Sequence, residues 1–357
     1  MGLFNLFKKN KPEKKRKSAT IKVLQNEKIT ADGSRIHFDV PAELSTNFQF
    51  IPGQYLNIHI ENGGKKHVRS YSICSGINEP LAIGVKAVEN GLVSNYLVNQ
   101  LKAGDSIQVD FPMGNFKLTD DLKSIVCFAA GSGITPFMSF AKSLKSDQKM
   151  RLFFGNATKE STFFLSELST MTNPSTTFTY TKAVYEDTRS GRLDKKLVSE
   201  LIKEELSLLR ADGFFICGPE EMILSIQEVL LVFGVPKEKI HFELFTTPVL
   251  IKAESKLDSS NTFKGVSQVS AILDGDIQRI ELKSEGASIL DALINSGMDA
   301  PYSCKGGVCC TCKAKIIEGS AKMDINYSLT DQEVQDGYIL TCQAHPTSEV
   351  LKIDYDV

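Results

Sequence analysis

Between Thr20 and Asp110 the chain alternates short segments of β-branched and aromatic residues with turn residues. One stretch with helical spacing, LVSNYLVNQL, interrupts them. Short strands at regular intervals with turn signals between them predict an antiparallel barrel or sandwich. The predicted strands are TIKVLQNEKIT, SRIHFDV, QYLNIHI, VRSYSIC, LAIGVKAV and SIQVD.

From Lys123 onward the pattern changes, because apolar runs now alternate with longer amphipathic segments. The apolar runs are SIVCFAA, MRLFFG, TFTYTKAV and GFFICG, and the helical patterns are FMSFAKSL, LDKKLVSELIKEEL and EEMILSIQEVLLVF. Strands that alternate with helices in this way predict βαβ units and a parallel sheet. The pattern ends at the strand IHFELF.

A stretch without periodicity follows, and a third strand-rich part begins near Gly265. Strands are expected at QVSAILDG, QRIELKS, CKAKIIEG and EVLKIDYD, with a helix at SILDALINSG. The whole pattern predicts a multidomain chain. Its expected parts are a tail at 1–19, a barrel domain at 20–118, an α/β domain at 119–247, a linker at 248–265 and an α+β domain at 266–357.

Composition supports a folded chain, since 42% of the 357 residues are hydrophobic and 24% are charged. We find no apolar run long enough to span a membrane, and the start MGLFNLFKK lacks the features of a signal peptide. The expected location is the cytoplasm.

The net charge of −2 hides an uneven distribution. Lys8 to Lys17 carry seven basic residues and one Glu, which is typical of a solvated tail. Weak contact with acidic lipid or nucleic acid is the lesser alternative, and we expect no nucleic acid as a partner of the protein. From Ser267 to the end there are 14 acidic and 7 basic residues. An acidic surface of this kind favours docking onto a basic protein partner.

The cysteines carry the strongest chemical signal. Cys304, Cys309 and Cys312 have the C-x4-C-x2-C spacing of a plant-type [2Fe–2S] cluster, and Cys342 supplies the fourth thiolate. Glycines 306 and 307 allow the backbone to turn closely around a cluster. The alternative, a structural zinc site, usually shows paired CxxC motifs, and only one CxxC occurs here.

Two ordered motifs in the barrel segment, RSYSIC at 69–74 and NGLVSNYL at 90–97, together with PMGNF at 112–116, resemble the flavin-binding signature of the ferredoxin–NADP reductase superfamily. The resemblance implies that Arg69 pairs with the flavin phosphate, Tyr71 packs on the flavin, and Ser72 places a hydroxyl near the reactive flavin nitrogen. At 90–97, backbone amides at a helix start would meet the pyrophosphate.

The α/β segment carries the turn GSGITP after one strand and ICGPEEM after another. A glycine turn between a strand and a helix is suited to holding phosphates. ICGPEEM resembles the C-G-P-x-x-M motif of the same superfamily, in which the residue matching Cys217 lies beside the nicotinamide. The resemblance further implies that Glu243 influences flavin protonation and that Phe245 covers the flavin ring.

The sequence leaves NADPH and NADH open as donors. NADPH-dependent members of the superfamily usually carry an Arg at the position of Ala157, where it holds the 2′-phosphate; here Thr158, Lys159 and Lys182 are the alternative candidates. The expected catalytic residues are Ser72, Cys217 and Glu243, and the expected metal ligands are the four cysteines. The expected cofactor-binding residues are Arg69, Ser70, Tyr71, Ser72, Val85, Lys86, Gly91, Leu92, Val93, Ser94, Gly131, Ser132, Gly133, Thr135, Pro136, Cys217, Gly218 and Pro219.

The order of flavin barrel, nicotinamide domain and β-grasp ferredoxin domain resembles the reductase subunits of phenylacetyl-CoA epoxygenase and related oxygenases. The resemblance implies FAD and a [2Fe–2S] cluster as cofactors, and transfer of electrons from NAD(P)H to a partner oxygenase, hydroxylase or desaturase. Nicotinamide delivers two electrons as hydride, whereas the cluster accepts one at a time, so a flavin is needed between them. Two alternatives remain: a general ferredoxin- or flavodoxin-type reductase, and a non-catalytic redox sensor.

Overall fold

The computed structural model of the protein describes residues 18–246 and 263–357. The expected basic tail and most of the expected linker lie outside the described residues. The N-terminal barrel and the parallel-sheet domain together form one compact unit, and most of residues 263–357 form a second. Among the described helices, none has the length and apolar character needed to cross a membrane.

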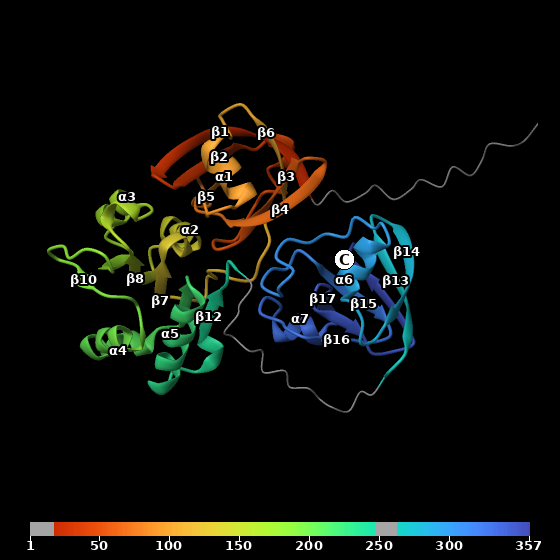
Figure 1. The fold of residues 1–357 in the computed structure, drawn as a ribbon. Coiled ribbons are helices and arrows are strands. Elements are labelled where there is room, and N and C mark those ends of the chain that lie inside the picture. Colours follow the sequence, from red (N-terminus) through yellow and green to blue (C-terminus); the bar gives the residue numbers. More distant parts are fainter. Residues whose placement is uncertain (1–17, 247–262) are drawn as a thin grey trace, which may run out of the picture. The chain divides into compact units, whose positions relative to one another are not determined.

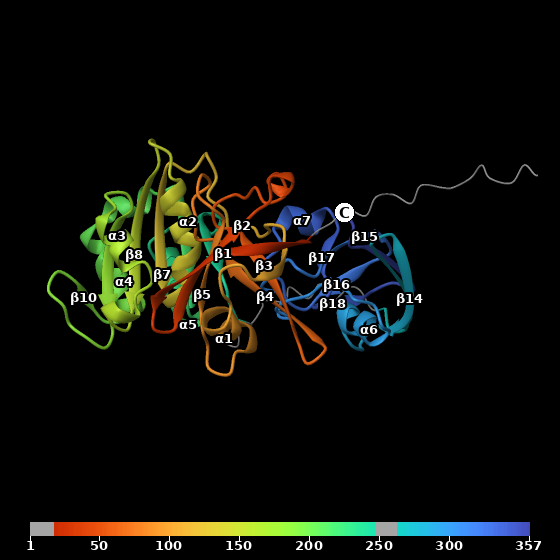
Figure 2. The same cartoon turned by 90° about the horizontal axis from the view of Figure 1, so that it is seen from above.

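The N-terminal domain is a six-stranded antiparallel barrel with the strand order β4-β3-β6-β1-β2-β5. A bridge between Ile73 and Ile83 joins the two edge strands and so closes the barrel. The helix α1 lies against β2, β4 and β5 (Figure 2). The elements are β1 Ser18–Thr30, β2 Gly33–Asp39, β3 Tyr55–Asn62, β4 Lys65–Ser72, β5 Ala82–Lys86, α1 Leu92–Asn99 and β6 Ser106–Asp110.

The second domain is a six-stranded parallel sheet with the order β10-β9-β8-β7-β11-β12. Helices α2 and α3 cover one face of it, and α4 and α5 cover the other (Figure 1). The strands are β7 Ser124–Ala130, β8 Lys149–Asn156, β9 Ser175–Tyr180, β10 Arg189–Ser190, β11 Gly213–Cys217 and β12 Ile240–Glu243. The helices are α2 Thr135–Ser143, α3 Leu165–Thr170, α4 Lys195–Glu204 and α5 Glu220–Val232.

Aromatic packing joins the barrel to the parallel sheet. Phe116, which follows the last barrel strand, packs its ring on Phe137 and Phe140 of α2 and on Phe215 of β11, with ring centroids 5.3 to 5.7 Å apart. All four rings are buried. Burial of large aromatic side chains dominates the energy of such contacts, so this cluster holds the two domains together as one unit.

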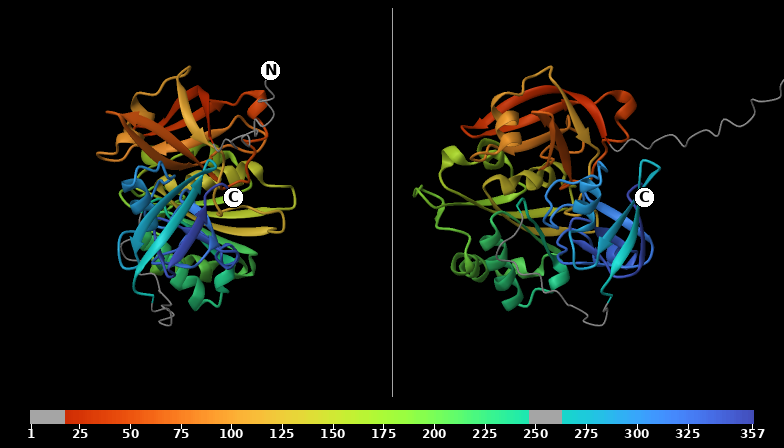
Figure 3. Two further views of the ribbon diagram at one scale, coloured as in Figure 1. Left: turned by 90° about the vertical axis from the view of Figure 1, so that its right-hand side faces the viewer. Right: turned by 45° about the vertical axis from the view of Figure 1, so that its right-hand side comes forward.

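The C-terminal domain has a five-stranded mixed sheet with the order β14-β13-β19-β15-β17 and a two-stranded sheet of β16 and β18. The hairpin of β13 and β14 forms its cyan edge in Figure 3. Its strands are β13 Val266–Leu273, β14 Asp276–Lys283, β15 Lys313–Glu318, β16 Ala321–Met323, β17 Tyr338–Leu340, β18 Ala344–Pro346 and β19 Val350–Asp354, and its helices are α6 Ile289–Asn295 and α7 Asp331–Gln335.

The predicted fold class is confirmed in all three parts. The sequence pattern did not predict α3, α7 or the short strands β10, β16, β17 and β18, since each has at most six residues and shows no clear periodicity. The strand expected at 177–184 ends earlier, at Tyr180.

Candidate functional site

The three expected catalytic residues meet where the barrel contacts the parallel sheet. Ser72 is the last residue of β4, while Cys217 and Glu243 end the neighbouring parallel strands β11 and β12 and are partners in register. The Ser72 hydroxyl donates a hydrogen bond to Oε2 of Glu243 at 3.3 Å. Cys217 and Glu243 lie together because parallel strands end at a common edge, and the contact between the two domains brings Ser72 to them.

Burial sets the protonation of this cluster. It raises the pKa of Glu243 from its usual value near 4.5 to about 8, and the hydrogen bond from Ser72 offsets only part of that shift. Burial also raises the pKa of the Cys217 thiol, and the nearby Glu243 charge raises it further. At neutral pH the site therefore holds a neutral thiol and a largely protonated carboxyl group.

On β4 the side chains alternate between two faces, as a strand requires. Arg69 and Tyr71 share one face; burial raises the pKa of the Tyr71 hydroxyl, and the charge of Arg69 counteracts part of that rise. The Arg69 guanidinium is exposed and donates to its neighbour's carbonyl oxygen, that of Val68, at 2.7 Å. Ser70, on the other face, donates to Oδ1 of Asn57 at 2.8 Å.

The segment NGLVSNYL contains a helix start, that of α1. Gly91 is the N-cap of α1, and a Cβ at this position would lie 2.5 Å from the Ser94 hydroxyl oxygen. That oxygen accepts the Val88 amide at 3.2 Å. Ser94 thus shapes the turn, whereas the Val93 side chain is buried in the barrel core and Leu92 is partly exposed.

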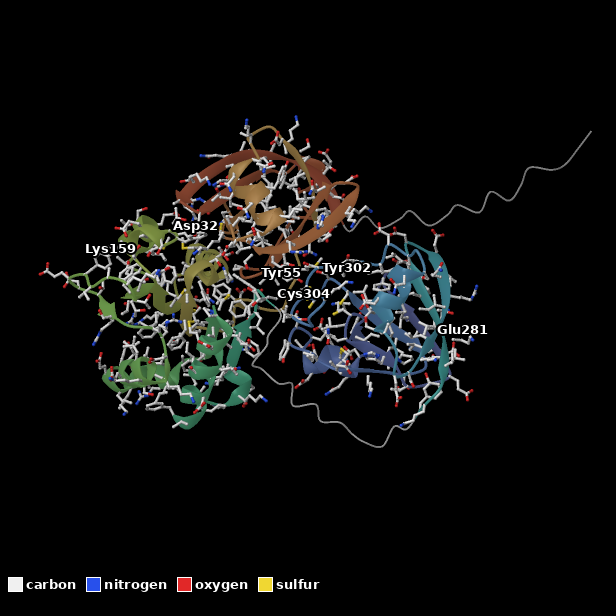
Figure 4. The ribbon with its side chains drawn as sticks, viewed as in Figure 1. Asp32, Tyr55, Lys159, Glu281, Tyr302 and Cys304 are labelled. Atoms are coloured by element: carbon white, nitrogen blue, oxygen red, sulfur yellow. The ribbon has the colours of Figure 1, made fainter. Side chains whose placement is uncertain are left out.

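Two of the expected cofactor residues have other contacts. The Val85 side chain is fully buried in the barrel core, so it is not available to a cofactor. Lys86, the next residue, lies 3.4 Å from the carboxylate of Asp32, which is labelled in Figure 4. Lys86 also lines the cavity described below.

The GSGITP turn connects β7 to α2. Gly131 has a positive φ of 54°, a conformation that glycine adopts without strain. A Cβ at Gly133 would lie 2.2 Å from the carbonyl oxygen of Cys217, so only glycine fits. Thr135 donates to the carbonyl of Ser132 at 3.0 Å, and Pro136 follows it at the start of α2.

A cavity of about 320 Å³ opens at the carboxyl ends of the parallel strands. Ligands of open α/β sheets bind in this position. Three of its lining residues were predicted to bind a cofactor, namely Lys86, Gly131 and Pro219, and Met222 ends the predicted motif ICGPEEM. The others include Ala130, Gly155, Asn156, Ala157, Ser161, Thr181, Arg192, Leu193, Asp194, Glu221 and Ser225.

The three residues suggested as substitutes for the missing phosphate-binding Arg do not line this cavity. Thr158 is engaged in a capping box with Ser161, and the Lys159 ammonium lies over the ring of Tyr185, 4.6 Å from its centroid (Lys159 is labelled in Figure 4). Arg192 does line the cavity, a residue that sequence reasoning missed. Its position in the segment SGRLD, directly before α4, was the available signal.

The expected iron ligands Cys304 and Cys309 lie together, with their sulfur atoms 3.2 Å apart. The Gly306 amide donates to the Cys304 sulfur at 3.3 Å, as expected for a loop that wraps thiolates with backbone amides. Cys304, labelled in Figure 4, is half-buried and Cys309 is buried. Two paired thiols with an amide donor fit the iron–sulfur chemistry that the spacing predicts.

Cys312 and Cys342 are buried at the edge of the C-terminal sheet. Thr341 contacts the Cys312 carbonyl oxygen through both its amide, at 3.2 Å, and its hydroxyl, at 3.0 Å. The Thr341 hydroxyl in turn accepts from the buried Tyr355 hydroxyl at 2.9 Å. The segment with the fourth cysteine is therefore fastened to the segment with the third.

Three family models match in the expected order. An oxidoreductase FAD-binding domain matches residues 20–118, an oxidoreductase NAD-binding domain matches residues 128–228, and a 2Fe-2S iron-sulfur cluster binding domain matches residues 271–347. These matches and the sites above define the chain as an NAD(P)H-dependent oxidoreductase that uses FAD and a [2Fe–2S] cluster.

Whole-chain relatives narrow this class. A component of the 1,2-phenylacetyl-CoA epoxidase of Escherichia coli (strain K12) is 32% identical over 94% of this chain and 97% of its own. The chain belongs to the family of oxygenase reductases that contains this epoxidase component.

Two solved structures share the fold. Phthalate dioxygenase reductase, described as a modular structure for electron transfer from pyridine nucleotides to [2Fe-2S], aligns with a TM-score of 0.57 and 22% identity over 94% of this chain and 98% of its own. A type IV self-sufficient cytochrome P450 monooxygenase aligns with a TM-score of 0.70 and 20% identity over 94% of this chain. The chain spans only 41% of that longer protein.

Proposed function

We propose that this protein supplies electrons from NAD(P)H to a separate oxygenase, hydroxylase or desaturase component. The observation that carries the proposal is the meeting of Ser72, Glu243 and Cys217 at the ends of β4, β12 and β11, in a chain that also pairs Cys304 with Cys309. The names of the relatives, a component of an epoxidase and a reductase of a dioxygenase, support an oxygenase as the acceptor.

When bound, the flavin would accept a hydride and the cluster would release single electrons. The chain's own residues orient the reactants. Gly131 leaves open space at the turn where the dinucleotide phosphates would lie, and Gly133 lets that turn approach the Cys217 carbonyl oxygen. Cys217 and Gly218 shape the end of β11 where the nicotinamide ring would lie. Glu243 holds a proton on its carboxyl group and Ser72 orients that group.

We assign the cluster ligands to Cys304, Cys309, Cys312 and Cys342. The surrounding domain is acidic, with 14 acidic and 7 basic residues from Ser267 onward. Such a charge favours fast encounter with a basic surface on the acceptor.

The proposed function is tested by turnover with one-electron acceptors. We expect NAD(P)H to reduce cytochrome c through the purified holoenzyme, and to drive substrate oxidation only when the oxygenase component is added. Reduction of ferredoxins or flavodoxins with no requirement for an oxygenase would indicate a general reductase. A protein that binds nucleotide without any turnover would be a redox sensor, and either outcome contradicts the proposal.

We further propose that NADPH is the donor, with Arg192 as the cation for its 2′-phosphate. The Arg192 side chain is exposed at the cavity, and no residue in the described parts of the chain pairs with its guanidinium. The neighbouring Asp194 also lines the cavity, but its Oδ1 accepts the Leu197 amide at 2.9 Å as the N-cap of α4. An unpaired guanidinium suits a phosphate because it donates in a planar fork.

We expect Arg192→Ala to weaken binding of 2′-AMP about tenfold, since a charge-assisted contact to phosphate contributes roughly 1.5 kcal/mol at an exposed site. Binding of 5′-AMP should stay within twofold. Isothermal titration measures both without any redox cofactor turning over. Lys182→Ala is the matched control and should leave both affinities unchanged. If the wild type binds 2′-AMP no better than Arg192→Ala does, the proposed role of Arg192 is wrong and NADH is the favoured electron donor.

A further inference from the structure

Five charged side chains of alternating sign run across the contact between the barrel and the parallel-sheet domain. In order they are Glu27, Arg35, Glu167, Lys142 and Glu79. The contacts are 2.8 Å from Arg35 to Glu27, 2.8 Å from Arg35 to Glu167, 3.1 Å from Lys142 to Glu167 and 3.2 Å from Lys142 to Glu79. We call this set the ion-pair chain.

The two cations of the ion-pair chain are largely buried. The side chains of Arg35 and Lys142 are each only 13% exposed. A buried cation is tolerated only when it is paired and hydrogen-bonded. Arg35 meets this condition with Nη1 near both Glu167 oxygens and with Nε and Nη2 on Glu27, so its planar group fixes the direction of both contacts.

Two of the four contacts join different domains. Arg35 on β2 and Glu79 after β4 belong to the barrel, whereas Lys142 on α2 and Glu167 on α3 belong to the parallel-sheet domain. Glu167 is the central acid, because it accepts from one cation of each domain.

The ion-pair chain contacts the loop that directly follows β4, which we call the flavin strand because it carries Arg69, Tyr71 and Ser72. Ser72 ends that strand, and four residues later the Gly76 amide donates to Oε2 of Glu79 at 3.0 Å. The Ile77 amide donates to the hydroxyl of Ser143, the last residue of α2, at 3.2 Å. A Cβ at Gly76 would lie 3.0 Å from the Lys142 carbonyl oxygen, so the loop packs directly on the helix.

The N-terminal end of α2 follows the GSGITP turn, which we call the nucleotide turn. Helix α2 spans Thr135–Ser143 and starts directly after the turn of Gly131 to Ile134. One short helix therefore connects the proposed phosphate site at its first turn to the loop behind Ser72 at its last turn. A shift of the helix would move the nucleotide relative to the flavin strand.

We propose that Glu167 and Lys142 are positioning residues for hydride transfer, which fix α2 and its nucleotide turn against the flavin strand. The proposal rests on the proposed function. A misplacement of reacting groups by about 1 Å costs on the order of a hundredfold in rate. Weakening the ion-pair chain should therefore slow flavin reduction while leaving nucleotide affinity nearly unchanged.

The test compares Glu167→Gln, Lys142→Met and the conservative Lys142→Arg in the holoenzyme. Glu167→Gln is the milder change, because Arg35 keeps Glu27 and Lys142 keeps Glu79 as partners. Anaerobic stopped-flow measurements give the limiting rate of flavin reduction and the nucleotide Kd separately. We expect the rate to fall at least tenfold in the first two variants, the Kd to stay within twofold, and Lys142→Arg to recover most of the rate.

Hydrogen exchange gives a readout that does not depend on turnover. The Gly76 and Ile77 amides should exchange faster in Lys142→Met, because Glu79, the acceptor of the Gly76 amide, loses its partner on α2. The increase should be smaller in Glu167→Gln, where Lys142 keeps Glu79 and α2 loses only its link to Glu167. Lys123→Met is the control, since it removes an exposed pair with Asp147 within the same domain and should change neither readout.

Variants with a lower Tm but a wild-type rate of flavin reduction would overturn the positioning role and leave the ion-pair chain as a stabilising feature. A rise in the nucleotide Kd of these variants, with no change in their limiting rate of flavin reduction, would overturn the positioning role as well. If the wild-type holoenzyme is not reduced by NAD(P)H at all, the proposed function itself fails, and that result is distinct from any effect of the variants.

Discussion

Replacing Cys304, Cys309, Cys312 or Cys342 singly by Ser is expected to remove or severely weaken the iron–sulfur absorbance of the purified protein. The reason is that each thiolate is assigned as one of only four ligands, and Ser is a poor substitute for the soft sulfur that iron–sulfur clusters require. Flavin reduction by NAD(P)H should remain largely intact, because the residues that we propose for hydride transfer, Ser72, Cys217 and Glu243, lie on the barrel and the parallel sheet. Anaerobic visible spectroscopy before and after NAD(P)H addition measures both effects.

Cys310→Ser is the matched control, since Cys310 lies between the ligands but outside the C-x4-C-x2-C spacing. Its spectrum should resemble that of the wild type. Unchanged spectra in the four ligand variants would refute the assignment. Protein that contains zinc in place of iron and sulfide would support the alternative structural site.

Glu243→Gln is expected to lower the limiting rate of flavin reduction by about a hundredfold, the usual scale for a positioned acid or base. The substitution should also remove the pH dependence of this rate near pH 8. Because the pKa of Glu243 is raised to about 8, the carboxyl group carries its proton at neutral pH and loses it as the pH rises through 8. The wild-type rate should therefore decline above about pH 8, whereas the variant's rate should not titrate there. Stopped-flow reduction between pH 6 and 9.5 tests this.

Ser72→Ala provides an internal check on the same titration. The Ser72 hydrogen bond lowers the pKa of Glu243, so its loss should move the midpoint of the rate profile to higher pH. Identical profiles for the wild type and Glu243→Gln would assign the titration to another group.

The raised pKa also links Glu243 to stability. The folded protein holds this proton between about pH 4.5 and 8, where the unfolded chain has lost it. Stability contributed by this group therefore falls as the pH rises through that window, and Glu243→Gln should remove that part of the dependence.

Much of the fold could be predicted because its elements are long and strongly patterned. The predicted strand SIVCFAA matches β7 residue for residue. The helix predicted at 220–233 matches α5 except that α5 ends one residue earlier, at Val232. The short elements could not be predicted, because α3 and β16 to β18 are set by tertiary contacts and not by a local period.

The candidate site divides in the same way. Ser72, Cys217 and Glu243 were expected from motifs, and the structure brings them together. Arg192 was missed because its place at the cavity depends on which strand ends surround that cavity, and no local motif reports this. The burial of Val85 in the barrel core and the contact of Lys159 with Tyr185 also depend on tertiary structure, so the sequence could not predict them.

The close approach of Gly133 to the Cys217 carbonyl oxygen has a consequence for engineering. A Cβ at Gly133 would lie only 2.2 Å from that oxygen, so the turn after β7 and the end of β11 pack backbone against backbone and must fit each other. Grafting one of them alone from a relative would leave mismatched backbones, whereas the rim around Arg192 lies on separate loops. Donor preference should therefore be exchangeable at that rim without retuning the geometry of the reaction centre.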